Sequence, residues 1–421
     1  MLDIKLIRQD PEFVKKGVKD KGNDSNLVDQ IIELDLKRRN LIQEIGDIRH
    51  KKTEAENKLI KEGKDENALK ILKEVKVFLS EKEESLKQYE LDLEKAMIQL
   101  PNLPLKDVPV GLSGEDNVVL REVGKKPNFS FKPLDYLTLG ESLDIIDVKR
   151  ASKTSGSRFG FLKNQAAVLE FALINYALSV IIKKGFTPIV PPVMIKPDLF
   201  KAMGYMDQSD EEMYHLTKDE LYLVGTSEQI VGPMHSDEVF DKNDLPKRYV
   251  SFSSCFRREA GSYGKDTKGI LRVHQFDKLE MLVFSLPEES EKEQQLILKI
   301  EEELMKGLNL PYRVIRICTA DLSHPSASSY DIETWLPSDN TYRETHSNSN
   351  CTDFQTRRLD IKYKDKKTGE TYCVHLLNGT VFAIGRMIIA ILENYQLKDG
   401  SVSIPKVLWP YSFGIKVIKK I

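Results

Sequence analysis

Cysteine is scarce in this sequence and shows no metal-binding or disulfide pattern. The four cysteines, Cys255, Cys318, Cys351 and Cys373, include no Cys-x-x-Cys pair. The N-terminus is mixed in charge and lacks the apolar run of a secretory signal. We therefore expect free thiols in a reducing, cytoplasmic compartment, and no structural zinc; a zinc site built from these cysteines is the less favoured alternative.

The sequence also lacks a long uninterrupted apolar run and a strong net charge. Its most apolar stretch, Ala166 to Ile182, is shorter than the ~20 residues of a membrane span and contains Glu170 and Asn175. This pattern predicts a buried helix and no membrane partner. The formal net charge is only −2, so any contact with a nucleic acid must use local basic patches.

Between residues 27 and 100 there is no proline, and Gly46 and Gly63 are the only glycines. Apolar residues recur there at steps of three and four, the pattern of a coiled-coil seam. The seam positions are Leu27, Ile31, Leu34, Leu41, Ile45, Ile48, Ala55 and Leu59, then Leu72, Val75, Leu79, Leu86, Tyr89, Leu93, Ala96 and Leu100. A reversal at residues 61–65 predicts an antiparallel hairpin of two helices, each of about 35 residues and roughly 50 Å long.

The composition changes after this helical region. Prolines at 101, 104 and 109 stop the helix, so we predict an N-terminal domain at 1–105 and a linker at 106–117. From residue 118 onward, short apolar strands alternate with helices. We therefore predict one large α+β domain at 118–421.

Residues 249–284 predict a β-hairpin whose tip contains several glycines. In the second predicted strand, Leu271–Phe284, side chains alternate between two faces, of which one is apolar and the other polar. The polar face carries Arg272, His274, Phe276, Lys278 and Glu280. An aromatic ring between cations suits a nucleotide, because the ring stacks on a base while cations meet phosphates. A solvated strand face would look equally polar, so both interpretations remain open for this segment alone.

The residues 256–259, followed by 272–276, resemble motif 2 of the class II aminoacyl-tRNA synthetases, in the form of the seryl-tRNA synthetase family. Four other segments are similar to parts of that family: motif 1 at 185–192, the serine-binding loop at 222–228, the metal and ATP segment at 342–355, and motif 3 at 378–386. The resemblance covers essentially the whole chain, including the N-terminal hairpin. It implies an antiparallel sheet of six or seven strands flanked by helices, with an N-terminal antiparallel α-helical coiled-coil arm.

The resemblance implies a ligase that activates L-serine with ATP to seryl-adenylate and pyrophosphate. The enzyme then transfers serine to the 3′ end of tRNA(Ser), and of tRNA(Sec) where that tRNA exists. A homodimer formed through motif 1 is also implied. Two alternatives remain: an amino acid:carrier protein ligase, which would lack the arm and use zinc, and a paralogue without aminoacylation activity.

The resemblance also implies roles for individual residues. Catalytic roles fall to Arg257, which bridges the α-phosphate and the serine carboxylate, to Arg386 near the γ-phosphate, and to Glu344. Glu344 and Ser347 would hold Mg²⁺, which prefers such hard oxygen ligands. The implied ATP-binding residues are Arg257, Arg258, Glu259, Arg272, Val273, His274, Gln275, Phe276, Glu344, Thr345, His346, Ser347 and Arg386. The implied serine-binding residues are Thr226, Ser227, Glu228, Arg257, Glu280, Asn378 and Thr380.

A basic stretch on the first predicted helix is expected to contact tRNA phosphates. It consists of Lys37, Arg38, Arg39, Arg49, Lys51 and Lys52. A solvated coiled-coil face would also be rich in charge, so this alternative stands for each single residue. The sequence departs from the family pattern at Val381, where a glycine is common, at His346 and Asn348, where smaller residues are common, and in the segment 320–331.

Overall fold

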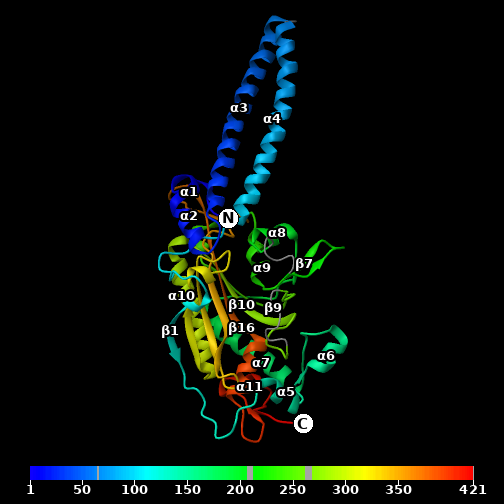
Figure 1. Cartoon of the computed structure of the whole chain (residues 1–421), viewed down its shortest axis with the longest axis vertical. Helices are drawn as coiled ribbons and strands as arrows, with labels where there is room; N and C mark the ends of the chain where they lie inside the picture. Colours follow the sequence, from blue (N-terminus) through cyan, green and yellow to red (C-terminus); the bar gives the residue numbers. More distant parts are fainter. Residues whose placement is uncertain (64–65, 206–211, 261–267, 421) are drawn as a thin grey trace. The chain divides into compact units, whose positions relative to one another are not determined.

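The computed structural model describes residues 1–63, 66–205, 212–260 and 268–420 (Figure 1). It divides the chain into two compact units, Met1–Leu103 and Pro104–Ile421. The first unit is helical and consists of α1 (Ile4–Gln9), α2 (Pro11–Asp20), α3 (Asn26–Glu62) and α4 (Glu66–Gln99). Its short helices pack against the start of α3, where Ile7, Val14, Val18 and Ile31 are fully buried.

Helices α3 and α4 form the predicted hairpin, drawn in blue and cyan in Figure 1. They have 37 and 34 residues, which is about 50–55 Å of helix. The predicted seam is confirmed by burial, because Ile31, Leu41, Ile45 and Ala55 are buried on α3. Gly63 ends α3 with φ of 80°, a conformation that glycine adopts without strain. The rest of the predicted reversal, residues 64–65, lies outside the described residues.

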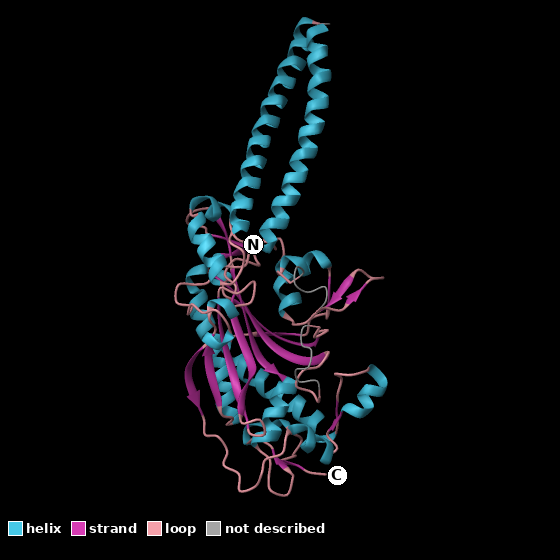
Figure 2. Ribbon diagram, in the orientation of Figure 1, coloured by secondary structure: helices cyan, strands magenta, loops and turns pink. Residues whose placement is uncertain are grey.

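The second unit is built on one large sheet, shown in magenta in Figure 2. Among the described residues it has eight strands, in the order β1-β11-β12-β13-β16-β10-β9-β4. Their bounds are β1 Val118–Val123, β4 Thr187–Ile189, β9 Lys247–Phe256, β10 Gln275–Ser285, β11 Tyr312–Arg316, β12 Ser328–Leu336, β13 Thr341–Asn350 and β16 His375–Ala383. All neighbours pair antiparallel except β4, which lies parallel to β9. The predicted antiparallel sheet is confirmed, but the expectation of six or seven strands was too low.

Four smaller sheets accompany the main one in the described part of the second unit. Their strands are β2 Ile146–Asp147 with β3 Phe161–Leu162; β5 Met194–Ile195 with β6 His215–Leu216 and β7 Leu221–Leu223; β8 Val239–Asp241 with β14 Lys362–Lys364 and β15 Thr371–Cys373; and β17 Val402–Ser403 with β18 Val417–Ile418. The helices are α5 Tyr136–Ser142, α6 Val148–Ser155, α7 Asn164–Ile181, α8 Pro197–Ala202, α9 Glu228–Val231, α10 Ser290–Leu308 and α11 Ile384–Asn394.

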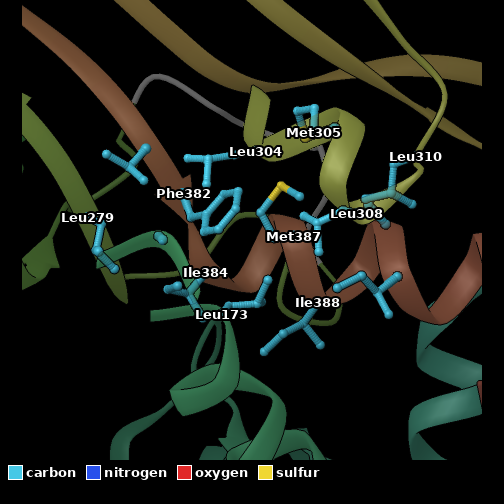
Figure 3. Packing of buried hydrophobic residues seen from close by; sticks show 14 of the residues in the cluster. Leu173, Leu279, Leu304, Met305, Leu308, Leu310, Phe382, Ile384, Met387 and Ile388 are labelled. Carbon is cyan, nitrogen blue, oxygen red and sulfur yellow. The ribbon is translucent and has the colours of Figure 1, made fainter. Parts of the chain in front are cut away.

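The main core lies where α7, α10 and α11 pack on the sheet. Figure 3 shows Leu173 of α7, Leu304 of α10 and Met387 of α11 meeting around Phe382 of β16. The segment Asn164–Lys184 has the length and hydropathy of a membrane span, and half of its most apolar stretch is buried inside the protein. A core helix passes the same test, and α7 buries nine of its residues here.

The sheet has two chemically different faces. On β13 and β16, Asn348 and Gly379 point toward α10, where Asn348 donates a hydrogen bond to Glu301 at 2.8 Å. On β10, Leu279 is buried in the core, while its neighbours Lys278 and Glu280 point to the other face. A β-bulge shifts the β10–β16 register between Leu279 and Glu280. Helices therefore cover one face, and the opposite face is left for polar side chains.

The structure revises the start of one predicted strand and shows where the predicted linker packs. Strand β10 begins at Gln275, so residues 271–274 of the predicted strand precede it without strand pairing. The glycine-containing tip at 261–267 lies outside the described residues. The predicted linker, 106–117, belongs to the second unit, where Val108 packs with Ile315, Ile317 and Leu322. The segment is therefore held against the edge of the sheet by the packing of apolar side chains.

Candidate active site

A pocket of about 190 Å³ lies at the ends of β10, β13 and β16 and the start of α11. Its lining brings together residues from three of the predicted motifs. It consists of Arg257, Glu259, Ile270, Leu271, Arg272, Val273, Phe276, Lys278, Glu344, Thr345, Thr380, Ala383, Gly385 and Arg386. Three arginines and one lysine in a small pocket make it suited to an anionic ligand.

Arg257 follows β9 directly and reaches into the pocket. Its Nε donates to the carbonyl oxygen of Gly225 at 3.2 Å. Its guanidinium carbon lies 5.3 Å from the centre of the Phe276 ring, within cation–π range. The predicted contact residues for a phosphate and for a base therefore lie side by side.

Glu259 occupies a strained backbone position beside Arg257. Its φ is 54°, in the left-handed region that is uncommon for residues other than glycine. Its carboxylate lies 2.5 Å from Arg272 Nε, and its carbonyl oxygen accepts from Arg158 at 3.2 Å. Strained residues of this kind cluster at ligand-binding sites, where surrounding contacts hold them in place.

Glu344 and Arg386 face each other on the other side of the pocket. Arg386 Nη1 donates to the Glu344 carbonyl oxygen at 2.9 Å and lies 3.2 Å from carboxylate Oε1. The Glu344 side chain is about half exposed, at 48%. Its carboxylate is therefore accessible as a hard oxygen donor, which fits the predicted Mg²⁺ ligand. Ser347 does not line this pocket; it hydrogen bonds to Asp331. Burial of Asp331, together with the nearby Glu344 charge, raises the pKa of Asp331 well above its usual value.

Glu280 is the centre of a buried polar cluster next to the pocket. Its Oε2 lies 2.6 Å from Lys278 Nζ and accepts a hydrogen bond from the Thr226 hydroxyl. Ser227 Oγ lies 3.5 Å from the same oxygen and 2.6 Å from Ser251 Oγ. The carboxylate is almost fully enclosed, and the loop before α9 is tied to β10 through it.

Glu228 begins α9 and is also buried. Tyr205 OH donates to its Oε2 at 2.9 Å, and Gln355 Nε2 donates to its Oε1 at 2.8 Å. Burial first, and then the neighbouring Glu280 charge, raises the pKa of Glu228. Two carboxyl groups enclosed together create a strong preference for a cation.

Asn378 and Thr380 lie on β16 in register with the site face of the sheet. Thr380 is paired with Glu280 across the strands and lines the pocket. Asn378 is buried, and its Nδ2 lies 3.9 Å from the Cys351 sulfur. Both side chains therefore belong to the polar end of the site, where the predicted serine-binding residues converge.

Besides Ser347, four of the predicted ATP-binding residues have side chains elsewhere. Arg258 and Gln275 are exposed, and Gln275 lines a neighbouring cavity of about 340 Å³. His274 Nδ1 donates to the Arg257 carbonyl oxygen at 3.0 Å, with its ring near Phe159. His346 is fully buried against Phe382, and burial lowers its pKa to about 3. The structure does not bring these four side chains into the pocket.

Three residues of the site were given no individual role by sequence reasoning. Lys278 was placed on the polar strand face with Phe276 and Glu280, but not among the site residues. Gln355 ends the segment 342–355, and Tyr205 lies outside every motif; only the fold brings these two to Glu228. Among the departures from the family pattern, Val381 is fully buried at the β10–β16 bulge.

The predicted tRNA-binding residues lie along α3 of the first unit. Most are close to an acidic side chain: Lys37 to Glu33 at 2.6 Å, Arg38 and Arg39 to Asp35 at 3.5 and 2.9 Å, Arg49 to Glu83 at 2.9 Å, and Lys52 to Glu56 at 3.7 Å. Lys51 is exposed and, within the described part of the chain, has no acidic partner within 4 Å.

Two family models match the chain. The model described as "Seryl-tRNA synthetase N-terminal domain" matches residues 1–104. The model described as "tRNA synthetase class II core domain (G, H, P, S and T)" matches residues 212–395. The two matches cover the helical unit and the part of the sheet that carries the pocket.

Similar proteins span the full length of the chain. A serine–tRNA ligase of Nocardia farcinica is 42% identical, with 98% of each chain covered. One of Thermotoga neapolitana is also 42% identical, over 99% of this chain and 100% of its own. A seryl-tRNA synthetase of Pyrococcus horikoshii, solved with ATP, has 40% identity and a TM-score of 0.95, covering 100% of both chains. A serine–tRNA ligase of Naegleria fowleri, solved with AMP, has 34% identity and a TM-score of 0.89, covering 100% of this chain and 99% of its own.

Proposed function

This chain belongs to the seryl-tRNA synthetase family, and from that premise we propose how its pocket activates serine and charges tRNA. The chain is a serine–tRNA ligase, which joins serine to ATP as seryl-adenylate and then to tRNA. The observation that carries the residue assignments is the convergence of Arg257, Glu344 and Arg386 in one pocket, beside the enclosed carboxylate of Glu280. These residues come from separate sequence motifs, so their meeting supports a common role.

Arg257 and Arg386 would neutralise and align ATP. The first step brings a carboxylate to a negatively charged phosphate, so its rate depends on charge compensation and alignment. A planar guanidinium can bridge two anionic groups, which suits Arg257 for the serine carboxylate and the α-phosphate. Phe276 would stack on adenine, and Glu259 would accept from its amino group. Arg386 would hold the far phosphates.

Glu280 and Glu228 would bind the serine ammonium group. Both carboxyl groups are buried, so a cation there gains strongly from the low dielectric. Thr226 fixes Glu280 from the adjacent loop. Asn378 and Thr380 would face the serine hydroxyl, and a pocket that pairs a hydroxyl rejects alanine, because its own polar groups would be left unpaired.

Glu344 would hold Mg²⁺ in the pocket; Ser347, which hydrogen bonds to Asp331 and does not line the pocket, stays a predicted second ligand. A bound Mg²⁺ would neutralise phosphate charge and orient the pyrophosphate leaving group. The accessible Glu344 carboxylate supports the assignment. Its contact with Arg386 would keep both groups on the same phosphates.

The partners of the whole chain would be L-serine, ATP and tRNA(Ser), with tRNA(Sec) where it exists, in the cytoplasm. The basic residues of α3 would meet tRNA phosphates. A homodimer would form through the segment from α7 to β4, where Phe171 on α7, Ile182 just after α7 and Val190 just after β4 expose 57%, 46% and 81% of their surface. Large apolar side chains left exposed are found at many protein interfaces.

Amino-acid-dependent pyrophosphate–ATP exchange tests the proposal. Purified protein is assayed with Mg²⁺ and each of the twenty amino acids. Exchange with serine alone is expected, followed by transfer of serine to tRNA(Ser). Exchange with another amino acid would overturn the assignment of the Glu280 pocket. Exchange with none would favour the paralogue without aminoacylation activity.

A further inference from the structure

Lys278 is a buried cation for which the sequence motifs supply no role. It lies on β10 between Phe276 and Glu280, and only 8% of its side chain is exposed. Its Nζ lies 2.6 Å from Glu280 Oε2, and its side chain lines the pocket with Arg257 and Arg386. Enclosing an ammonium group is costly without a paired carboxylate, so the Glu280 contact keeps this charge inside the site.

The pleat of β10 places Lys278 between the two ends of the site. Phe276, Lys278 and Glu280 occupy alternate positions of the strand, so successive members are about 7 Å apart on one face. The intervening Leu279 is fully buried in the core, which fixes this alternation. Phe276 marks the adenine end and Glu280 marks the ammonium end. Lys278 is therefore next to the region where the serine carboxylate meets the α-phosphate.

We propose that Lys278 is a catalytic residue of seryl-adenylate formation, released for this role when the serine ammonium group takes its place on Glu280. The inference rests on the proposed function of this pocket. Glu280 Oε2 now contacts Lys278, Thr226 and, at 3.5 Å, Ser227. A second ammonium on the same carboxylate would repel the first strongly in this enclosed site. Serine binding therefore drives the flexible lysine stem away from Glu280 and toward the phosphate.

The chemistry gives the released ammonium a defined task. A serine carboxylate oxygen bonds to the α-phosphorus, and the bond from that phosphorus to the bridging oxygen of the β-phosphate breaks. Pyrophosphate leaves with the electron pair, and the step transfers no proton. Lys278 donates to a non-bridging α-phosphate oxygen while Arg257 bridges the two reactants. One such preorganised donor contributes about 100- to 1,000-fold to the rate.

The first test is Lys278→Met, which keeps an unbranched apolar stem and removes the charge. Serine-dependent exchange is expected to fall about 100-fold or more, mainly in kcat. Without serine, Lys278→Met and the wild type should bind AMP with affinities within about twofold of each other. In the wild type without serine, Lys278 contacts Glu280 and does not contribute to nucleotide binding. Lys242→Met is the matched control, since Lys242 is paired with Asp365 at 2.9 Å outside the pocket. That control should exchange normally.

Chemical rescue separates a role of the charge from a role in folding. Lys278→Cys is treated with 2-bromoethylamine, which restores an ammonium group on a thioether stem. Exchange should return to a large part of the wild-type rate. The wild type treated in parallel controls for the native cysteines, of which Cys255, Cys318 and Cys351 are buried.

A binding experiment tests the displacement itself. Serinamide carries the ammonium group of serine without a carboxylate. In the wild type it should tighten binding of α,β-methylene-ATP about fivefold or more, and in Lys278→Met it should have no effect. Exchange by Lys278→Met within about threefold of wild type would overturn the proposal, as would equal serinamide coupling in both proteins. Absence of exchange in the wild type would instead overturn the proposed function.

Discussion

The Nε2 atom of Gln355 lies 2.8 Å from Oε1 of Glu228, across 127 residues of sequence. The same amide nitrogen is 3.2 Å from the Met203 carbonyl oxygen, so its direction is fixed by two acceptors. Tyr205 OH holds the other carboxylate oxygen at 2.9 Å. Among the described residues, the side-chain donors that orient the proposed ammonium ligand are thus neutral, which leaves its negative charge for the substrate.

Removing this donor should weaken serine binding. Hydrogen bonds to charged groups contribute roughly 1.5–3 kcal/mol, so we expect Gln355→Leu to raise KM for serine about 10- to 100-fold. KM for ATP should change by less than about twofold, because Gln355 lies outside the nucleotide pocket. Steady-state exchange kinetics measure both constants. Gln396→Leu, at a buried glutamine bonded to Leu134, is the control; equal increases in both constants for Gln355→Leu would contradict an orienting role.

The raised pKa of Glu228 predicts a pH dependence of serine binding. Burial and the Glu280 charge raise this pKa, so protonation occurs at higher pH than for a solvated glutamate with a pKa of about 4.3. The protonated group has no charge to offer an ammonium. KM for serine should therefore rise as pH falls toward the raised pKa, at saturating ATP, and Glu228→Gln should flatten this part of the profile. The same pH profile of KM in the wild type and in Glu228→Gln would refute the assignment.

Glu170 of α7 predicts a pH dependence of stability. Burial, and then a hydrogen bond with Asp277 of β10, raises the pKa of Glu170 from 4.5 to about 8. Between these values the folded protein keeps a proton that the unfolded chain releases, so stability falls as pH rises. Relative to Glu170→Gln, we expect the wild type to lose about 3 kcal/mol of unfolding free energy between pH 5 and pH 8. Urea unfolding at both pH values measures it; parallel behaviour of the two proteins would show that Glu170 ionises normally.

Lys51 should contribute more to tRNA binding than its paired neighbours. Among the described residues, the Lys51 ammonium has no acidic partner, so it breaks no ion pair on binding a phosphate. The Lys37 ammonium lies 2.6 Å from Glu33 and would have to break that ion pair. Lys51→Gln should lower tRNA affinity and reduce the slope of log affinity against log salt by about one. Lys37→Gln should change both less, and serine-dependent exchange should be unchanged in each. Filter binding over a salt series decides, and a larger effect at Lys37 would mean that its ion pair opens on the tRNA.

Local patterns in the sequence predicted much of the architecture. The helical hairpin was predicted because a seam needs only a periodicity of three and four, which residues such as Ile31 and Leu41 carry by themselves. The pocket residues Arg257, Glu344 and Arg386 were predicted by resemblance, because their motifs are contiguous. The start of β10 was not, since residues 271–274 alternate like a strand but lie before it; there, the His274 N–H donates to Arg158 at 3.0 Å, away from β9.

The sequence by itself determined the heptad seam, the order of the motifs and the family, all of which are properties of neighbouring residues. The tertiary structure alone decided which side chains meet. It turned His346 into the core although its motif predicted an ATP contact, because β13 has a bulge beside it that sets the alternation. It also brought Tyr205 and Gln355 to Glu228, and Lys278 to Glu280. Burial and the pairing of distant segments fix such contacts, and the neighbouring residues in the sequence determine neither of them.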